Sequence, residues 1–184
     1  MNEITIGQAS KLTSPNPLVL VCTRKPDGST NLAAVSWWTY LTFKPGMLAF
    51  AMGQRSYSGE RIRETGKVVL AVPGRELAEA VLKCGSSTGR ITDKVKEFGM
   101  ELVSPREDPE GDAKESTEDA EENRICIPAH TRVAFACTLE KYEPVGDHNL
   151  YICRVDHVYA EESEEALFAW EGYSVVAPAK RTGM

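Results

Sequence analysis

Short apolar runs rich in β-branched residues recur along the chain and are separated by turn residues. The first lies at 18–23 and ends at Pro26-Asp27-Gly28, where glycine allows the positive φ of a tight turn. A returning strand is therefore expected over 31–40. Further strands are expected at 47–52, 67–73, 132–140 and 149–159, and the short connection between the last two favours an antiparallel pair.

Helical spacing is limited to three short stretches. They lie at 58–65, which stops at Gly66 as helices often do, at 75–82, and at 91–98. Strands joined by hairpins, with few helices, predict a mainly β fold: an antiparallel β-barrel with a few short helices. The length suits one domain, so residues 1–184 are expected to fold as a single unit.

Two tryptophans stand side by side in the expected returning strand. Successive side chains of a strand point to opposite faces, so Trp37 and Trp38 cannot both enter one core by the usual alternation. One of the two indoles therefore needs a role outside that core.

The net charge of −6 belongs to one segment. Nine acidic residues and one lysine lie between positions 107 and 122, and this local charge of −8 leaves +2 for the rest of the chain. Such a run is typical of a solvated, flexible loop, expected here at about 107–123. A broad basic face is missing, so nucleic acid is not an expected partner. No apolar run approaches the length of a membrane span, and the expected location is cytoplasmic.

The cysteines and histidines do not follow metal-site spacing. Five scattered cysteines without a Cys-x-x-Cys pair argue against a disulfide framework and a zinc site, and favour buried free thiols. Cys84, beside a Gly-Ser-rich turn, is the one candidate redox thiol. The three histidines match no ligand motif, so no metal is expected, and hydrolase chemistry lacks a Gly-x-Ser-x-Gly motif.

Two stretches carry candidate chemistry. At 54–60 a strand ends and a helix begins, so Arg55, Ser56 and Ser58 would meet the free backbone N–H groups of a helix start and could bind an anion. The alternative is that Ser58 only caps the helix and Arg55 is solvated. The segment 85–90 lacks the spacing of a phosphate-binding P-loop; it either delivers Asp93 and Lys94 toward a bound group or is a plain polar loop.

From about residue 16 to 182 the sequence resembles the flavin reductase-like family, which includes flavoredoxins and uses the FMN-binding split barrel. The resemblance rests on the order and spacing of several short motifs. They are Asp27-Gly28-x-x-Asn31, Ser36-Trp37 with Pro45, Ser56-x-Ser58, Glu64-Thr65-Gly66, Cys84-Gly85, Gly89-x-x-x-Asp93-Lys94 and Gly146-Asp147-His148.

The resemblance implies an FMN site at the subunit interface of a homodimer. Arg55, Ser56, Ser58 and Lys94 would hold the phosphate, and Asn31, Ser36 and Thr39 would meet the polar edges of the ring. Trp37 would flank the flavin, while Trp38 enters the barrel or a dimer contact; alternatively, both indoles pack at the interface. His148 would lie near the nicotinamide or flavin, with His130 as the alternative. Phe168 would place an aromatic ring near the flavin, with Tyr173 in reserve.

The activity implied is that of an FMN-dependent oxidoreductase. Electrons would pass from NAD(P)H through FMN to a second flavin, ferric iron or a redox protein. One alternative is a flavoredoxin-like electron carrier reduced by a partner protein, with the acidic loop as its docking patch. A second is a flavin-free or haem-binding split-barrel module that acts as a sensor. The acidic loop is longer than expected for the family, and Trp38 doubles the usual tryptophan.

Overall fold

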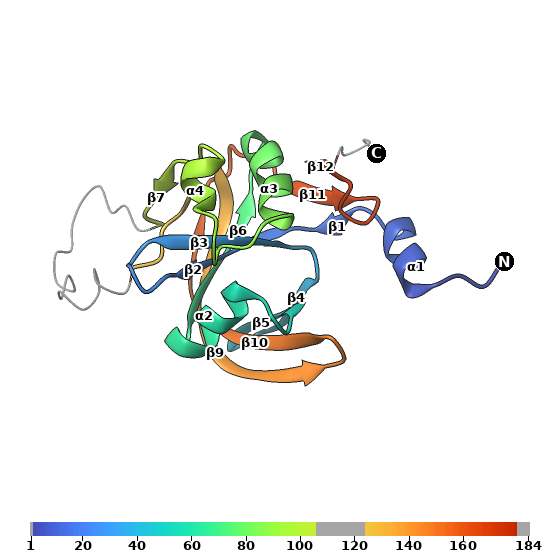
Figure 1. The fold of residues 1–184 in the computed structure, drawn as a ribbon, viewed down its shortest axis with the longest axis horizontal. Helices are drawn as coiled ribbons and strands as arrows, with labels where there is room; N and C mark the ends of the chain where they lie inside the picture. Colours follow the sequence, from blue (N-terminus) through green and yellow to red (C-terminus); the bar gives the residue numbers. More distant parts are fainter. Residues whose placement is uncertain (1, 106–123, 180–184) are drawn as a thin grey trace.

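The computed structural model describes residues 2–105 and 124–179, and the acidic segment 107–123 therefore lies outside the described residues (Figure 1). The helices are α1 (Ile6–Leu12), α2 (Tyr57–Thr65), the 3₁₀ turn η1 (Arg75–Leu77), α3 (Ala78–Gly85) and α4 (Lys94–Glu97). The strands are β1 (Asn16–Pro17), β2 (Val19–Arg24), β3 (Thr30–Val35), β4 (Trp38–Phe43), β5 (Gly46–Gly53), β6 (Lys67–Pro73), β7 (Leu102–Val103), β8 (Ile127–Pro128), β9 (Thr131–Val145), β10 (His148–Ala160), β11 (Leu167–Trp170) and β12 (Val175–Pro178).

Seven strands form the main sheet, in the spatial order β3-β2-β6-β9-β10-β5-β4. Every neighbouring pair in it is antiparallel. The two outermost strands, β3 and β4, follow one another in the chain, so the sheet curls until its edges approach. The backbone N–H of Ala51 in β5 donates to the Trp37 carbonyl at 2.9 Å, so the β4–β5 pairing continues into the crossing segment. The predicted antiparallel split barrel is thereby confirmed.

The expected single strand over 31–40 is wrong in one respect, because it breaks at Ser36-Trp37. Its first half is β3 and its second half is β4, at opposite ends of the sheet. Trp37 lies in the crossing, where 56% of it is exposed. Trp38 is half-buried and packs against Phe135 of β9, with ring centroids 5.9 Å apart. The two indoles thus occupy different environments, because Trp37 lies in the crossing and Trp38 in β4.

β2 is buried on both faces, which explains its continuous apolar sequence. One face contributes Val19 and Val21 to the barrel interior, where Ile62 of α2 also packs. The other face contributes Leu18, just before the strand, and Leu20 to a second core beneath α3 and the β11–β12 hairpin. The strand therefore separates two apolar layers, and a polar residue on either face would be buried.

The predicted helices are placed correctly, although their limits differ. Helix 58–65 is α2, which ends before Gly66 (φ +68°), but Ser56 and not Ser58 is its N-cap. Helix 75–82 is divided into η1 and α3, while 91–98 contains only the four helical residues of α4. Asp93 accepts a hydrogen bond from the Lys96 N–H at 3.3 Å, so the cap fixes the later start of α4.

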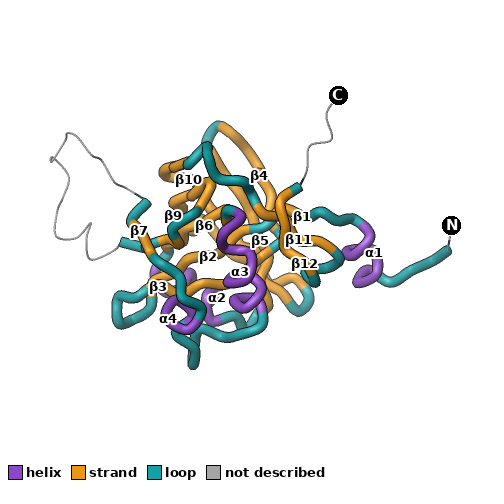
Figure 2. The backbone as a smooth tube through the Cα atoms, turned by 90° about the horizontal axis from the view of Figure 1, so that it is seen from above, coloured by secondary structure: helices purple, strands orange, loops and turns teal. Residues whose placement is uncertain are grey.

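Several elements were not predicted, among them α1 and the β11–β12 hairpin. α1 projects from the body and buries none of its residues (Figures 1 and 2). β11 pairs with β1 on one side and with β12 on the other. Across the described part of the chain, no helix has the length and apolar character needed to cross a membrane.

Gly59 provides a test of the packing between α2 and the barrel. A Cβ at this position would meet the hydroxyl of Tyr151, a fully buried residue of β10. We expect Gly59→Ala to lower the free energy of unfolding by about 1–3 kcal/mol, because overpacking outweighs the higher helix propensity of alanine. Denaturant unfolding measures the loss.

Two further variants test whether the clash with the Tyr151 hydroxyl causes the loss of stability. Gly7→Ala in α1, where nothing lies within 4 Å, is the control and should not destabilise the protein. Tyr151→Phe removes the hydroxyl, so Gly59→Ala should cost less in that background than in the wild type. An equal cost in both backgrounds would exclude the clash.

Candidate functional site

A cavity of about 340 Å³ lies at the break between β3 and β4. The crossing residues Ser36 and Trp37 form part of its wall, and His148 at the start of β10 forms another part. The remaining lining is mostly small or apolar: Ser10, Asn16, Ala34, Val35, Ala51, Met52, Gly53, Gly85, Gly172 and Tyr173. Three residues predicted for the flavin site, Ser36, Trp37 and His148, are thus brought together by the fold.

Trp37 and His148 contact each other in the wall. Their ring centroids are 5.1 Å apart, with an interplanar angle of 43°. His148 Nδ1 lies 2.7 Å from Oδ1 of Asp147, and this hydrogen bond lowers the pKa of the Asp147 carboxyl. The carboxylate is therefore ionised at neutral pH. An imidazole and an indole face are both presented to the cavity.

The C-terminal aromatic residue of the cavity is Tyr173 and not Phe168. Phe168 lies in β11, paired with Pro17, and is absent from the lining. Tyr173 follows a turn in which Glu171 and Tyr173 itself have positive φ, +49° and +82°. A Cβ on Gly85 would lie 3.0 Å from the Tyr173 ring, so the close approach depends on that glycine.

Asn31 and Ser58 are joined beneath the surface, away from the cavity wall. The Asn31 amide donates to Ser58 Oγ at 2.8 Å and to Thr23 Oγ1 at 3.1 Å. Its Oδ1 is buried and has no hydrogen-bond partner among the described residues. A Cβ on Gly89 would collide with this oxygen, so the 85–93 loop covers it. The two residues, predicted for different parts of the flavin site, are therefore hydrogen-bonded to each other and covered by protein.

The start of α2 borders the cavity through Met52. Ser56 Oγ accepts from the Gly59 N–H at 3.3 Å and lies 3.9 Å from the Met52 sulfur, which lines the cavity. Arg55 is exposed next to this helix start. Thr39 is exposed on β4, where its hydroxyl donates to the Tyr40 carbonyl, so it does not join the cavity. Thr39 is thus separated from Ser36, Trp37 and His148, which line the cavity.

Lys94 requires a correction, because its ammonium group is bound by the protein itself. It is 4% exposed and donates to the Leu32 carbonyl at 2.8 Å and to the Cys84 carbonyl at 2.9 Å. Burial lowers its pKa. Lys94 therefore ties α4 to β3 and to the end of α3, and it does not face a phosphate in this structure.

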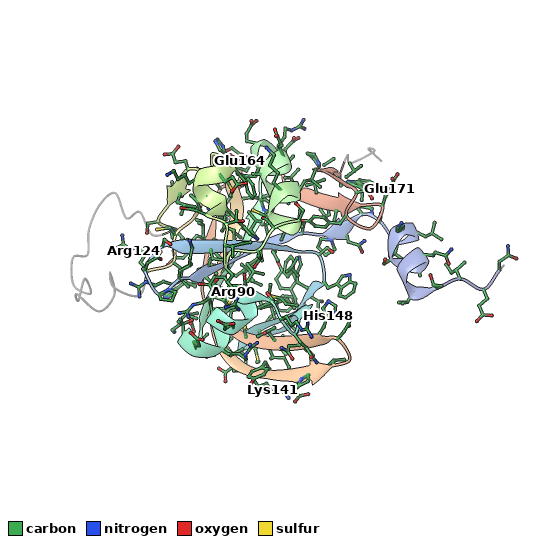
Figure 3. The ribbon with its side chains drawn as sticks, in the orientation of Figure 1. Arg90, Arg124, Lys141, His148, Glu164 and Glu171 are labelled. Carbon is green, nitrogen blue, oxygen red and sulfur yellow. The ribbon has the colours of Figure 1, made fainter. Side chains whose placement is uncertain are left out.

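His130 also lies away from the cavity. Its Nδ1 is 2.9 Å from Oε1 of Glu164, and its carbonyl accepts from the Gly74 N–H at 2.8 Å. Glu164 and His148 are well separated in Figure 3. The expectation that His130 could replace His148 at the flavin is therefore not supported by its position.

Cys84 does not have the environment of a redox thiol. It is buried, and this burial raises its pKa to about 11 although Lys94 opposes the shift. Reactive cysteines are accessible and have lowered pKa values. The five cysteines are free, and only Cys126 among them is less than fully buried, as the buried-thiol interpretation predicted.

A second cavity, also about 340 Å³, lies between the β2–β3 turn and the 89–93 loop. The Arg90 guanidinium lies 5.0 Å from the Tyr57 ring centroid and pairs with Glu60 at 2.5 Å. The sequence reasoning missed Arg90 and Tyr57, although the Gly-Arg pair at 89–90 was a usable signal. This cavity is polar, and neither Trp37 nor His148 lines it.

Comparison with known proteins assigns the family. The model of the flavin reductase like domain matches residues 12–177. The chain belongs to the flavin reductase-like family. An uncharacterized protein of Archaeoglobus fulgidus is 28% identical over 130 residues, and this match covers 70% of the chain but 64% of that relative's length.

Solved structures with the same fold include an FMN-binding protein and a flavoredoxin. An FMN-binding protein from Thermus thermophilus has a TM-score of 0.75 at 18% identity, covering 100% of this chain and 97% of the other. Flavoredoxin from Methanosarcina acetivorans gives 0.76 at 16% identity, covering 100% and 95%. At such identities the similarity shows the fold of this flavin reductase-like protein and not its electron donor or acceptor.

The residues in and around the first cavity fit FMN. Alanine and glycine in the lining leave room beside the Trp37 and Tyr173 faces for a flat ring. Ser36 and His148 supply polar groups at the wall, while Arg55 and the start of α2 supply the positive potential that a phosphate requires. The buried Oδ1 of Asn31 is an unused hydrogen-bond acceptor, but the 85–93 loop covers it.

Removing Lys94 should destabilise the fold, since two buried carbonyls would lose their donor. We expect Lys94→Ala to lower the free energy of unfolding by about 1–3 kcal/mol. Lys96→Ala, an exposed change in the same helix, should stay within about 0.5 kcal/mol of the wild type. Urea denaturation compares the two, and equal stability of the Lys94 and Lys96 variants would contradict the structural role.

Proposed function

We propose that this protein is an NAD(P)H-dependent oxidoreductase that uses FMN and passes electrons to a second flavin, ferric iron or a redox protein. The observation that carries the proposal is the cavity at the β3–β4 crossing, where Trp37 and His148 stand side by side in a wall of small residues. When bound, FMN supplies the chemistry by accepting a hydride and releasing electrons singly or in pairs.

The chain's own residues would bind FMN, orient its ring and shield it from water. Trp37 and Tyr173 offer apolar surfaces that exclude water from a flat ring. Ser36 would meet a polar ring edge, and Arg55 with Ser56, the N-cap of α2, would meet the phosphate. His148 would position a bound molecule through the ring nitrogen that Asp147 leaves free. Hydride transfer between stacked rings needs no protein acid, so the main contribution of the protein would be to orient the two rings.

Absorbance spectroscopy tests this function directly. We expect the purified protein, supplied with FMN, to show flavin bands near ~450 nm that bleach anaerobically on addition of NADPH or NADH. Trp37→Ala should weaken FMN binding by about tenfold, because a stacked aromatic contact is worth about 1 kcal/mol or more. Fluorescence titration with FMN measures the affinity.

The possible spectra separate the alternatives. Bands that persist until dithionite is added would replace the reductase by an electron carrier that a partner protein reduces. Failure to bind FMN would leave the fold without this chemistry, and a haem spectrum would identify a binding module.

We also propose that the protein is a homodimer in which a second copy covers β4. This edge strand has one strand partner in the sheet. Tyr40 (53% exposed) and Phe43 (84% exposed) lie on it, and Trp37 precedes it. Aromatic residues of this size are typical anchors of stable interfaces. The dimer would then bury one side of the cavity that Trp37 lines.

Phe43→Asp should weaken the dimer by about 30-fold or more, since truncating an anchor and burying a charge each oppose association. Sedimentation velocity over a range of concentrations measures this shift. Ile91→Asp is the matched control, because Ile91 is 86% exposed but belongs to the second cavity. Monomeric wild-type protein at micromolar concentration would refute the proposal.

A further inference from the structure

The turn before β10 carries a side chain of the cavity on a very short connection. Gly146 and Asp147 link β9 to β10, and Gly146 has a φ of +58°. His148 is the first residue of β10 and pairs in register with Gly53 of β5, which also lines the cavity. The orientation of the imidazole therefore depends on how firmly this turn is held.

Gln54 holds the turn through two hydrogen bonds. Its backbone N–H donates to the Asp147 carbonyl at 3.1 Å, and its side-chain Nε2 donates to the Gly146 carbonyl at 2.9 Å. Gln54 is exposed, so neither bond is explained by core packing. The two bonds fasten the hairpin tip to the segment between β5 and α2, directly beside Gly53.

Asp147 sets the imidazole itself. A neutral histidine has one N–H and one acceptor nitrogen, and its hydrogen-bond partner decides which nitrogen carries the proton. The Asp147 carboxylate can only accept, and its Oδ1 is 2.7 Å from Nδ1. Nδ1 therefore carries the proton, and Nε2 keeps a lone pair. The Asp147 side chain is 93% exposed, so its hydrogen bond contributes little to the stability of the fold. What the bond determines is the orientation of the His148 ring.

We propose that Gln54 and Asp147 are positioning residues for His148, which they hold as the Nδ1–H tautomer so that Nε2 accepts a hydrogen bond from an N–H group of the molecule bound in the cavity. The matching chemistry is an amide or imide N–H, found in the carboxamide of a nicotinamide cofactor and in the flavin ring. The identity of that ligand rests on the proposed function. The tautomer and the fastening of the turn do not.

Nitrogen-15 NMR of the ligand-free protein tests the arrangement. The chain has three histidines, and His130 meets Glu164 through the same ring nitrogen, so His130 is an internal control. At about pH 8.5, well above the ordinary histidine pKa, wild-type His148 should show a protonated Nδ1. In Asp147→Ala the proton should move to Nε2 while the His130 signals stay unchanged. A His148 tautomer that does not respond would overturn the proposal.

Hydrogen exchange tests Gln54. Gln54→Glu keeps the backbone N–H and the side-chain length but removes the amide donor. Amide exchange over residues 146–148 should accelerate by about fivefold, the effect of one lost hydrogen bond. Unchanged exchange would remove Gln54 from the proposal.

Single-turnover reduction of bound FMN tests the functional consequence. Asp147→Ala should slow reduction by about tenfold. Because Asp147 acts through His148, the double variant Asp147→Ala/His148→Gln should be no slower than His148→Gln alone. Additive losses would mean that Asp147 acts independently, against the proposal.

Two controls keep this result distinct from the proposed function. An acetylpyridine dinucleotide lacks the amide N–H, so if His148 binds the carboxamide, this analogue should reduce the wild-type flavin more slowly than the nicotinamide does, and the difference should disappear in Asp147→Ala. If His148 binds the flavin imide instead, Asp147→Ala should bind FMN less tightly. If neither nicotinamide reduces wild-type flavin, the proposed donor fails, and the NMR and exchange measurements still decide the positioning role.

Discussion

The connection between the two outermost strands of the main sheet is the constraint on which the rest of the structure depends. β3 and β4 stand at opposite ends of a seven-stranded sheet, with Ser36 and Trp37 alone between them. In a flat sheet these strands would be about 29 Å apart, whereas the extended chain from Val35 to Trp38 spans about 11 Å. The sheet must therefore curl into a barrel, and the crossing must pass over its open end.

The cavity follows from this crossing. The residues that bridge the two edges belong to neither strand, so Trp37 is released from strand alternation and is 56% exposed. β5 meets the crossing through the Ala51 hydrogen bond, and its continuation to Gly53 pairs with the start of β10 at His148. Trp37 and His148 come together because the closure of the sheet fixes both positions. Small residues around them then leave space, which longer side chains would fill.

Sequence patterns predicted the elements whose residues are uniformly buried, and they failed where tertiary contacts decide the conformation or the role of a residue. β2, β5 and β6 were predicted because their apolar runs are continuous, and α2 because Gly66 ends it. The break at Ser36-Trp37 was not predicted, because neither glycine nor proline interrupts the strand pattern there. Lys94 has the local sequence of a loop cation, and only the fold shows that carbonyls of β3 and α3 bind its ammonium group. The family resemblance put Trp37 and His148 in one site, and the fold brings them together, but it ranked Phe168 ahead of Tyr173, the residue that lines the cavity.

That last choice depends on a turn whose geometry no local pattern reveals. Glu171 and Tyr173 adopt the left-handed region, which costs about 1–3 kcal/mol for each non-glycine residue. Contacts from other parts of the chain offset this cost. The Glu171 N–H donates to Ser14 Oγ at 2.7 Å, and the Tyr173 ring packs on Gly85 at the end of α3. The N-terminal segment and α3 thus hold a strained turn that places an aromatic ring in the cavity wall. Strain held in place from two sides is characteristic of a site in which the position of one side chain matters more than local stability.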